Sequence, residues 1–503
     1  MRDHWIPIFG FAMACLAMET RQTPAADKAD PPNILFILTD DQGWPTLGCY
    51  GSHQVGTPNL DRLAVEGVRL TDAYVMPQCT PTRAALLTGQ HTARYGMWHV
   101  IGWYGSPWAP VSEPMFREQL EPEACQLPHR LRSAGYATGM AGKWHLTTNQ
   151  HGHYSHLRAT SGDAFGFDSV APPGPGSQNQ GDKWVDHLTD CAIDFIRDNR
   201  ERPWFYYLSH HTLHGELSAP DALVQKYLDA GAPKIGLHNA TYLACIEHLD
   251  HSIGRLLNTL DELALSDNTL VVFLSDNGGV DSRFHVPESS LQVLAGEQPL
   301  VLRDEGFDNA PLRDGKGSVY EGGLRVPCLV RWPAKIPAGR AITAPVHVVD
   351  WLPTLASAAG SPVDEPTDGH DLLPLLTQPS GLHPLGPPRS LYWFMPLYDL
   401  RWASTPCAAI RKDAFKLIWF FGDRFDRSYR YQVGETVELY KLDSDISESQ
   451  NLAQREPDRA ASLKAELKDW IERMGAVIPK PNPHHDASRA FEETRDPSVV
   501  TSR

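Results

Sequence analysis

The stretch Asn33-Ile-Leu-Phe-Ile-Leu-Thr-Asp-Asp-Gln42 indicates the fold class, because a run of apolar residues passes directly into acidic ones. A run that is apolar on both faces is typical of a buried strand in a parallel sheet. Three later stretches repeat this order of an apolar run followed by polar residues: 136–145, 204–214 and 269–279. The chain therefore predicts a set of buried strands that each end in polar side chains.

Helical patterns lie between these strands. The segments expected to be helical are 61–65, 126–133, 186–197 and 242–263. Alternating strands and helices predict an α/β domain, in which helices flank both faces of a large, mostly parallel sheet. Ligands of such sheets bind beyond the carboxyl ends of the strands. The polar clusters that follow the strands are therefore expected to converge on one site.

The regular alternation stops after about residue 385, which predicts a second, smaller unit of α+β type. Its expected elements are a β-hairpin over 408–418 that turns at Lys412-Asp413, a strand over 438–442 and a helix over 459–474. The predicted division is a leader over 1–26, a main domain over 27–385, a C-terminal subdomain over 386–479 and a tail over 480–503. The tail is polar and contains proline, so we expect it to be loose.

Composition excludes several classes of protein. The chain has 503 residues, of which 42% are hydrophobic and 21% charged, as in ordinary globular proteins. Its net charge of −16 argues against nucleic acid as a partner, since phosphate binding requires concentrated Lys and Arg. The eight cysteines occur singly, so neither a disulfide scaffold nor a C-x-x-C zinc site is expected. No stretch of about 20 apolar residues is present, so no integral membrane span is expected.

The first 26 residues resemble a secretory signal peptide. Arg2 precedes the short apolar run 5–18, and a mostly polar segment follows it. Pro7 interrupts the run, and a frayed cytosolic extension is the alternative. A signal peptide would place the mature protein outside the cell or in the periplasm.

Acidic residues follow two of the predicted strands. Asp40 and Asp41 are adjacent at one strand end, and Asp276 and Asn277 follow another. Buried carboxylates repel one another unless a cation lies between them. A set of carboxylate and amide oxygens favours Ca²⁺ or Mg²⁺ over Zn²⁺. The other interpretation is that both pairs only form turns.

Cys79-Thr-Pro-Thr-Arg83 opens a further helical pattern. Pro81 suits the first turn of a helix, and Arg83 lies one turn after Cys79, so both side chains can face one pocket. A cysteine at a helix N-terminus beside an arginine is expected to have a lowered pKa and to act as a nucleophile. A lone cysteine is otherwise most often a packed thiol.

Cys79-Thr-Pro-Thr-Arg-Ala-Ala-Leu-Leu-Thr-Gly89 resembles the first signature of the type I, formylglycine-dependent sulfatases, C-x-P-x-R-x-x-L-x-T-G, a family that includes the arylsulfatases. The stretch 135–145, which ends in Gly-Lys-Trp-His, is similar to their second signature. The resemblance continues in family order through 33–42, 275–279, 309–327, 349–355 and 438–443. It extends from about residue 31 to about residue 455.

This resemblance implies an alkaline-phosphatase-like sandwich and the hydrolysis of a sulfate ester. It implies that a separate maturation enzyme oxidises Cys79 to formylglycine, whose hydrate attacks the sulfur. By similarity, the residues that hold a divalent cation, Ca²⁺ or alternatively Mg²⁺, are Asp40, Asp41, Asp276, Asn277 and the modified Cys79. The residues that then stabilise anionic charge are Arg83, Lys143 and Lys316, with His214 or Lys316 as the acid for the leaving alcohol and His145 as the base.

The choice of His214 rests on placement after the strand that ends at Leu208. Members of the family usually have H-x-P after this strand, and here Gly215-Glu216 stand where x-P is expected. His211 is the alternative. Lys143 and His145 are two residues apart, so they would point the same way in an extended chain.

The resemblance leaves the substrate open between a sulfated carbohydrate and an aryl sulfate. Aromatic residues gather in 95–108 and could stack on a sugar or an aryl ring, or could simply pack within a long loop. The insert 281–308 could shape the pocket. The competing functions are a phosphonate or phosphate monoester hydrolase of the same fold, a non-catalytic protein that binds sulfated glycans, and a hydrolase that uses Cys79 as a thiol.

Overall fold

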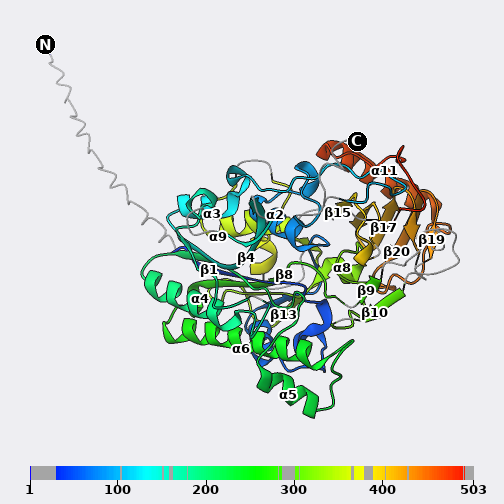
Figure 1. The fold of residues 1–503 in the computed structure, drawn as a ribbon. Coiled ribbons are helices and arrows are strands. Elements are labelled where there is room, and N and C mark those ends of the chain that lie inside the picture. The colour runs from blue at the N-terminus through cyan, green and yellow to red at the C-terminus, as the bar shows by residue number, and fades with distance from the viewer. Residues whose placement is uncertain are drawn as a thin grey trace.

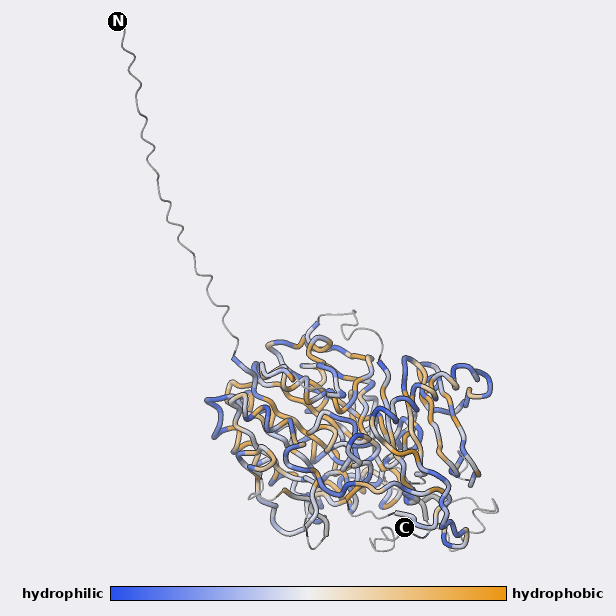
Figure 2. The backbone as a smooth tube through the Cα atoms, turned by 90° about the horizontal axis from the view of Figure 1, so that it is seen from above, coloured by the Kyte–Doolittle hydropathy of each residue, from blue (hydrophilic) through white to orange (hydrophobic). Residues whose placement is uncertain are grey.

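The computed structural model describes residue 1 and residues 30–492, except 102–104, 150–151, 158–161, 178, 281, 286–300, 305, 364–366, 379–388, 403, 427–429 and 491. It forms a large domain with a smaller sheet beside it (Figure 1). Hydrophobic stretches run through the interior of both parts, and hydrophilic ones gather in the outer loops (Figure 2). Within the described residues, no helix is long and apolar enough to cross a membrane. The leader predicted over 1–26 lies outside the described residues, apart from Met1.

A nine-stranded sheet forms the centre of the large domain. Its order is β13 (Arg340–Ile342), β2 (Val68–Leu70), β12 (Cys328–Arg331), β8 (Thr269–Ser275), β1 (Asn33–Thr39), β7 (Trp204–Ser209), β4 (Ala137–Asn149) and β5 (Gly152–His156), and β6 (Ser169–Val170) pairs with β4. The four strands expected from the sequence, β1, β4, β7 and β8, pair in parallel, as predicted. Because β12 pairs antiparallel with β8, the sheet is mixed.

Helices cover both faces of this sheet. Those of the large domain are α1 (Pro58–Glu66), α2 (Cys79–Thr88), α3 (Gln126–Ser133), α4 (Val185–Asn199), α5 (Asp221–Asp229), α6 (Ala240–Glu262), α8 (Glu321–Leu324), α9 (Trp351–Ala358) and α10 (Leu373–Thr377). Alternate residues of β1 point to opposite sides. Leu35 and Ile37 pack with apolar residues of α1, α4 and α6. Ile34 and Phe36 pack with those of α2, α3 and α9 on the other face, so two hydrophobic layers hold the strands between them.

Two small groups of paired strands complete the large domain. They are the small sheet of β11 (Arg325–Val326), β3 (Ala73–Tyr74) and β14 (Val346–His347), and the hairpin of β9 (Ser282–His285) and β10 (Val301–Asp304). This hairpin belongs to the insert predicted over 281–308, most of which lies outside the described residues.

The smaller sheet has four antiparallel strands, β15 (Ser390–Met395), β16 (Cys407–Lys412), β17 (Phe415–Phe420) and β20 (Thr436–Lys441), and β18 (Arg424–Phe425) and β19 (Tyr431–Gln432) form a separate pair. Helix α11 (Pro457–Met474) packs Leu463, Leu467 and Ile471 against this sheet. The predicted hairpin is present, with Asp413 at its turn at φ 53°. This arrangement agrees with the expected α+β character of the unit.

Buried ion pairs join the smaller sheet to the large domain. Lys416 of β17 lies 2.9 Å from a carboxylate oxygen of Glu321 and 2.9 Å from one of Glu448. The guanidinium groups of Arg325 and Arg411 both contact the carboxylate of Asp72. We call this group the interface cluster; it consists of Asp72, Glu321, Arg325, Arg411, Lys416 and Glu448.

The start of the tail, expected to be loose, is packed instead. Asn482 donates hydrogen bonds from Nδ2 to the carbonyls of Pro107 (2.9 Å) and Ala109 (2.7 Å). The guanidinium of Arg489 lies 3.3 Å from the ring centroid of Trp108. Residues 480–490 are therefore held by contacts with a loop far away in sequence, which their polar composition does not reveal.

Candidate active site

The register of the sheet aligns the carboxyl ends of β1, β7 and β8, so the polar residues there lie side by side. Leu38 of β1 pairs with Ser209 of β7, and Thr39 pairs with Ser275 of β8. Beyond these pairs, the amide of Asp40 donates to the carbonyl of Thr212 (2.9 Å). The amide of Asp276 donates to the carbonyl of Thr39 (3.0 Å). The segments that follow the three strands therefore meet, as the sequence predicts.

The acidic residues form one buried group. Asp40, Asp276 and Asn277 are fully buried, and Asp41 is nearly so. The Asp41 amide donates to Asp276 Oδ1 (3.2 Å), and Asn277 Nδ2 donates to Asp41 Oδ1 (2.7 Å). Among the described residues, Asp40 Oδ1 and Asn277 Oδ1 have no hydrogen-bond partner. Because buried oxygens without partners are costly, this oxygen-rich set fits a hard divalent cation.

The protonation of these carboxyl groups reflects their crowding. Burial, and then the charge of Asp40, raise the pKa of Asp276 to about 7. Burial acts to raise the pKa of Asp40 as well, but the charges of Lys143 and Arg83 help to hold it well below its ordinary value. The nearby cations thus stabilise the ionised form of Asp40 more than that of Asp276.

Three buried cations face the acidic group. Arg83 Nη2 lies 2.7 Å from Asp276 Oδ2, and Lys316 Nζ lies 2.7 Å from Asp41 Oδ1. Lys143 Nζ contacts Asp40 Oδ2. These cations and the three aspartates balance in formal charge. A divalent cation among them would leave the site positive and therefore attractive to an anion.

Cys79 is the first residue of α2 and is fully buried. Its sulfur lies within 4.8 Å of an oxygen of Asp40 and of an oxygen of Asp276, and 3.5 Å from His145 Nδ1. Burial raises the pKa of the thiol, although Lys143 and Lys316 act to lower it. The expectation of a lowered pKa is therefore wrong for the unmodified cysteine, because loss of solvent outweighs the nearby charges.

His145 and Lys143 reach the site by a backbone irregularity. They were expected to share a direction in an extended chain, but His145 has φ 54°, and the pairing of β4 with β5 shifts register between Lys143 and Thr147. Lys143 contacts Asp40, whereas His145 contacts Cys79. Burial lowers the pKa of His145 well below its ordinary value, so this ring is neutral at neutral pH.

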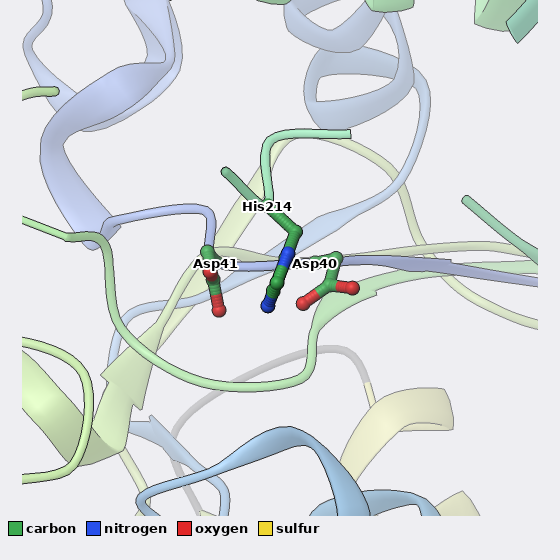
Figure 3. Close-up of side chains that lie close together, drawn as sticks. All are labelled: Asp40, Asp41 and His214. Atoms are coloured by element: carbon green, nitrogen blue, oxygen red, sulfur yellow. The ribbon is translucent and has the colours of Figure 1, made fainter. Parts of the chain in front are cut away.

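His214 lies beside the acidic group, with a ring nitrogen within 4.8 Å of oxygens of Asp40 and Asp41 (Figure 3). Its Nδ1 is 2.7 Å from the carbonyl oxygen of Gly215, which leaves Nε2 as the atom toward the site. Burial, and then Lys316 and Lys143, lower the pKa of His214 to about 4. His211 instead lies edge-on to Trp184, with 5.8 Å between ring centroids.

Other side chains of the site were not identified from the sequence. Ser209 donates from Oγ to the carbonyl of Lys143 (2.7 Å) and also contacts Arg83. Its position as the last residue of the buried strand β7 could have marked it. Gln78 and Trp402 could not have been found from local patterns, because Gln78 bonds to Asp399 and Trp402 lies near Lys316, each in a distant segment of the chain.

The aromatic stretch 95–108 does not line the acidic group where it is described. Trp98 is buried against Phe394 (5.6 Å between centroids), and Trp108 is covered by Arg489. These two residues favour the packing interpretation of the stretch. Trp103 and Tyr104 lie outside the described residues.

The buried oxygen-rich group at the strand ends, with Arg83, Lys143 and Lys316 beside it, is suited to binding an anionic ester next to a divalent cation. The sulfatase family model matches residues 32–361, and the model described as N-sulphoglucosamine sulphohydrolase, C-terminal, matches residues 314–476. Human arylsulfatase A is 34% identical over 410 residues, which cover 74% of this chain and 71% of that protein. A sulfatase of Formosa agariphila is 28% identical, with 94% of each chain covered.

Among solved structures, that of Ps i-CgsB in complex with k-i-k-neocarrahexaose has a TM-score of 0.66 and 26% identity, covering 88% of this chain and 93% of that one. The chain belongs to the sulfatase family. It is a sulfuric ester hydrolase with the alkaline-phosphatase-like fold.

Proposed function

We propose that this sulfatase acts on a sulfated carbohydrate or an aryl sulfate, with a formylglycine made from Cys79 and a bound Ca²⁺ ion. The observation that carries the proposal is the meeting of Cys79 with three carboxylates and three cations in one buried group. A protein that only bound sulfated glycans would need no such set of acids and bases.

The cation would be held by Asp40, Asp41, Asp276 and Asn277, together with the modified residue 79. Their donors are all oxygens, and two of them have no partner among the described residues, which favours Ca²⁺, with Mg²⁺ as the alternative. When bound, the cation supplies positive charge that offsets the oxygens of the ester.

Cys79 stands in the C-x-P-x-R sequence that the maturation enzyme reads. The modified residue supplies a nucleophilic hydroxyl group, which a thiol cannot. The raised pKa of the unmodified Cys79 speaks against a hydrolase that uses the thiolate, since burial keeps the sulfur protonated.

Lys143, Lys316 and Arg83 bind and orient the sulfate group. All three are buried, so their charges act through a medium of low polarity and are already in place before the substrate arrives. Loss of one such contact typically lowers turnover by about 10²–10³-fold.

His214 and Lys316 are the candidates to protonate the leaving alcohol, and His145 is the base. In the structure His214 is neutral at neutral pH because its pKa is about 4, whereas the pKa of Lys316 is raised by Asp41 against the effect of burial. An anionic substrate would raise the pKa of His214 and favour its protonated form. His145, beside Cys79, is placed to accept a proton at residue 79.

We further propose that residues 1–26 direct the protein out of the cytoplasm. Maturation of Cys79 would then precede or accompany export.

The test compares wild type with Cys79→Ala on 4-nitrophenyl sulfate and 4-nitrophenyl phosphate. We expect wild type to prefer the sulfate ester and Cys79→Ala to lose turnover while it keeps its fold by circular dichroism. Cys191→Ala, a half-buried cysteine on α4, is the matched control and should retain activity. The intact mass of the peptide that contains residue 79 reports the oxidation directly. Retained turnover in Cys79→Ala, or a preference for the phosphate ester, would refute the proposal.

A further inference from the structure

A short segment of the smaller unit reaches the active site. It is the helical turn η9 (Leu400–Trp402) with its neighbours Asp399 and Ser404, between β15 and β16. The buried carboxylate of Asp399 accepts a hydrogen bond at Oδ2 from Gln78 Nε2 (3.1 Å). Since Gln78 directly precedes Cys79, the segment is fixed beside the start of α2.

The same segment is fixed at the Lys316 side of the site. The hydroxyl of Ser404 donates to the carbonyl of Gly317, the residue after Lys316. Lys316 Nζ lies 5.7 Å from the ring centroid of Trp402. A Cβ at Gly317, which has φ 83°, would lie 2.6 Å from the indole of Trp402. A close approach of backbone and indole thus explains glycine at this position.

Arg401 is held in one orientation by Asp399. Its Nε lies 2.9 Å from Asp399 Oδ1, and its Nη2 lies 2.7 Å from Oδ2. The arginine side chain is 37% exposed, whereas Asp399 is fully buried. His99 also contacts Asp399 Oδ2 (3.1 Å), and burial lowers the pKa of His99, so this ring adds no charge at neutral pH.

The insert that follows Asn277 also borders this segment. The β9–β10 hairpin of the insert after Asn277 lies against η9. Arg401 and Trp402 therefore stand on a rigid support between residues 78 and 317, next to two residues of the proposed sulfate site. A side chain fixed before binding costs little entropy when a ligand arrives.

We propose, on the basis of the sulfatase function above, that Arg401 and Trp402 form a subsite for a saccharide that carries a second anionic group besides the scissile sulfate. Trp402 offers an aromatic face to the sugar ring, and Arg401 pairs with a carboxylate or a second sulfate on that sugar or its neighbour. An aryl sulfate has one anionic group, which Lys143, Lys316 and Arg83 already meet. We expect Arg401 to contribute mainly when the substrate carries a second anion, so the proposal selects an acidic saccharide over an aryl sulfate.

The kinetic test uses Arg401→Ala with three substrates: a monosulfated galactose disaccharide, the same disaccharide with a second sulfate on the neighbouring sugar, and a counterpart with a uronate there. We expect KM to rise by about 10- to 100-fold on the preferred dianionic substrate, since a hydrogen bond to a charged group is worth that much. Turnover of 4-nitrophenyl sulfate should be unchanged. The two dianionic substrates show whether the second group is a sulfate or a carboxylate.

Matched variants separate recognition from folding. Arg473→Ala, an exposed arginine on α11, should behave as wild type on every substrate. Trp402→Ala should raise KM for the disaccharides, and Trp402→Phe should restore much of it because it keeps an aromatic face. An equal loss of kcat on 4-nitrophenyl sulfate and on the disaccharides in Arg401→Ala would show that Arg401 only supports Gln78, and would overturn the proposal.

A binding measurement keeps this test independent of the chemistry. Calorimetry with the Cys79→Ala background should detect the dianionic disaccharide, and Cys79→Ala/Arg401→Ala should bind it at least about tenfold more weakly. Equal binding by both variants would refute the subsite even if the enzyme is a sulfatase. Conversely, a wild type that hydrolyses no sulfate ester refutes the proposed function, while the binding difference would still report on Arg401.

Discussion

The catalytic group and the interface cluster are both buried, and both combine three carboxylates with three cations. In the interface cluster, Lys416 lies between Glu321 and Glu448, and Asp72 lies between two arginines. Among the described residues, Asp40 Oδ1 and Asn277 Oδ1 of the catalytic group have no hydrogen-bond partner. Glu448 Oε1 of the interface cluster has no hydrogen bond either, but it lies 2.9 Å from Lys416 Nζ. Similar charges therefore serve to close one region and to leave the other ready for a ligand.

The difference lies in how the cations are placed. Lys416 and Asp72 each bridge two partners of opposite charge, which offsets the cost of burial for all of them. In the catalytic group, Arg83 likewise lies near two carboxylates, 2.7 Å from Asp276 and 3.7 Å from Asp40, whereas Lys143 and Lys316 each contact a single aspartate. Burial, and then the charge of Asp40, raise the pKa of Asp276 to about 7. Because Glu448 of the interface cluster also has a pKa raised to about 7, a raised carboxyl pKa is common to both regions, and the catalytic group differs in holding Cys79 beside its carboxylates.

The largest expected effect is loss of the cation from the catalytic group. Asp276→Ala removes two carboxylate oxygens and leaves Arg83 without its main partner, so we expect turnover to fall to background and bound metal to be lost. Elemental analysis of the purified variant measures the metal. Glu448→Gln, in the interface cluster, should keep normal metal content, and a normal content in Asp276→Ala would place the ion elsewhere.

Next in size is the loss of an acid or base from the catalytic group. His214→Ala should lower turnover by about 10²–10⁴-fold, the usual range for a general acid. His211→Ala, whose ring packs on Trp184, should have the smaller effect. Steady-state kinetics on one sulfate ester would compare the turnover of the two variants. A larger loss in His211→Ala than in His214→Ala would assign the role of general acid to His211.

In the interface cluster, the corresponding change affects stability. Lys416→Met leaves Glu321 and Glu448 buried without their shared cation, which should lower the free energy of unfolding by about 3–5 kcal/mol. Lys412→Met is the control, since that partly exposed lysine pairs with Glu466 and should cost below about 1 kcal/mol. Urea titration measures both, and similar losses in the two variants would show that the cluster is not the joint between the units.

The smallest effect is a change in pH dependence. Burial raises the pKa of Glu448 from 4.5 to about 7, with Glu321 adding to the rise and Lys416 opposing it. The folded protein therefore binds this proton more tightly than the unfolded chain, so the stabilisation is complete below pH 4.5 and is lost as pH rises through 7. Relative to Glu448→Gln, wild type should lose about 1–3 kcal/mol between about pH 5 and 8. A constant difference in unfolding free energy over that range would contradict the shift.

The parts of the molecule that the sequence could predict depend on local patterns. Asp40, His214 and Asp276 lie in the polar segments that follow apolar runs, so the parallel sheet and the meeting of these residues could be expected. The raised pKa of Cys79 could not, because it depends on how completely the fold excludes water. The positive φ of His145 also leaves no periodic signal.

Contacts between distant segments could not be predicted from the sequence either. Asp399 and Gln78 are separated by 321 residues, and nothing near either one marks the other as its partner. The docking of 480–490 on the loop at Trp108 depends on matched surfaces that polar composition does not disclose. Such contacts depend on the tertiary structure.

The complete burial of Cys79 also sets an order of events during biosynthesis. On the proposal that a separate enzyme oxidises this residue, its sulfur is within reach only before α2 is enclosed, and the enclosure includes Asp399, which is synthesised much later. A chain that folds with its thiol intact would therefore be trapped as an inactive product, and later exposure to the maturation enzyme would not rescue it.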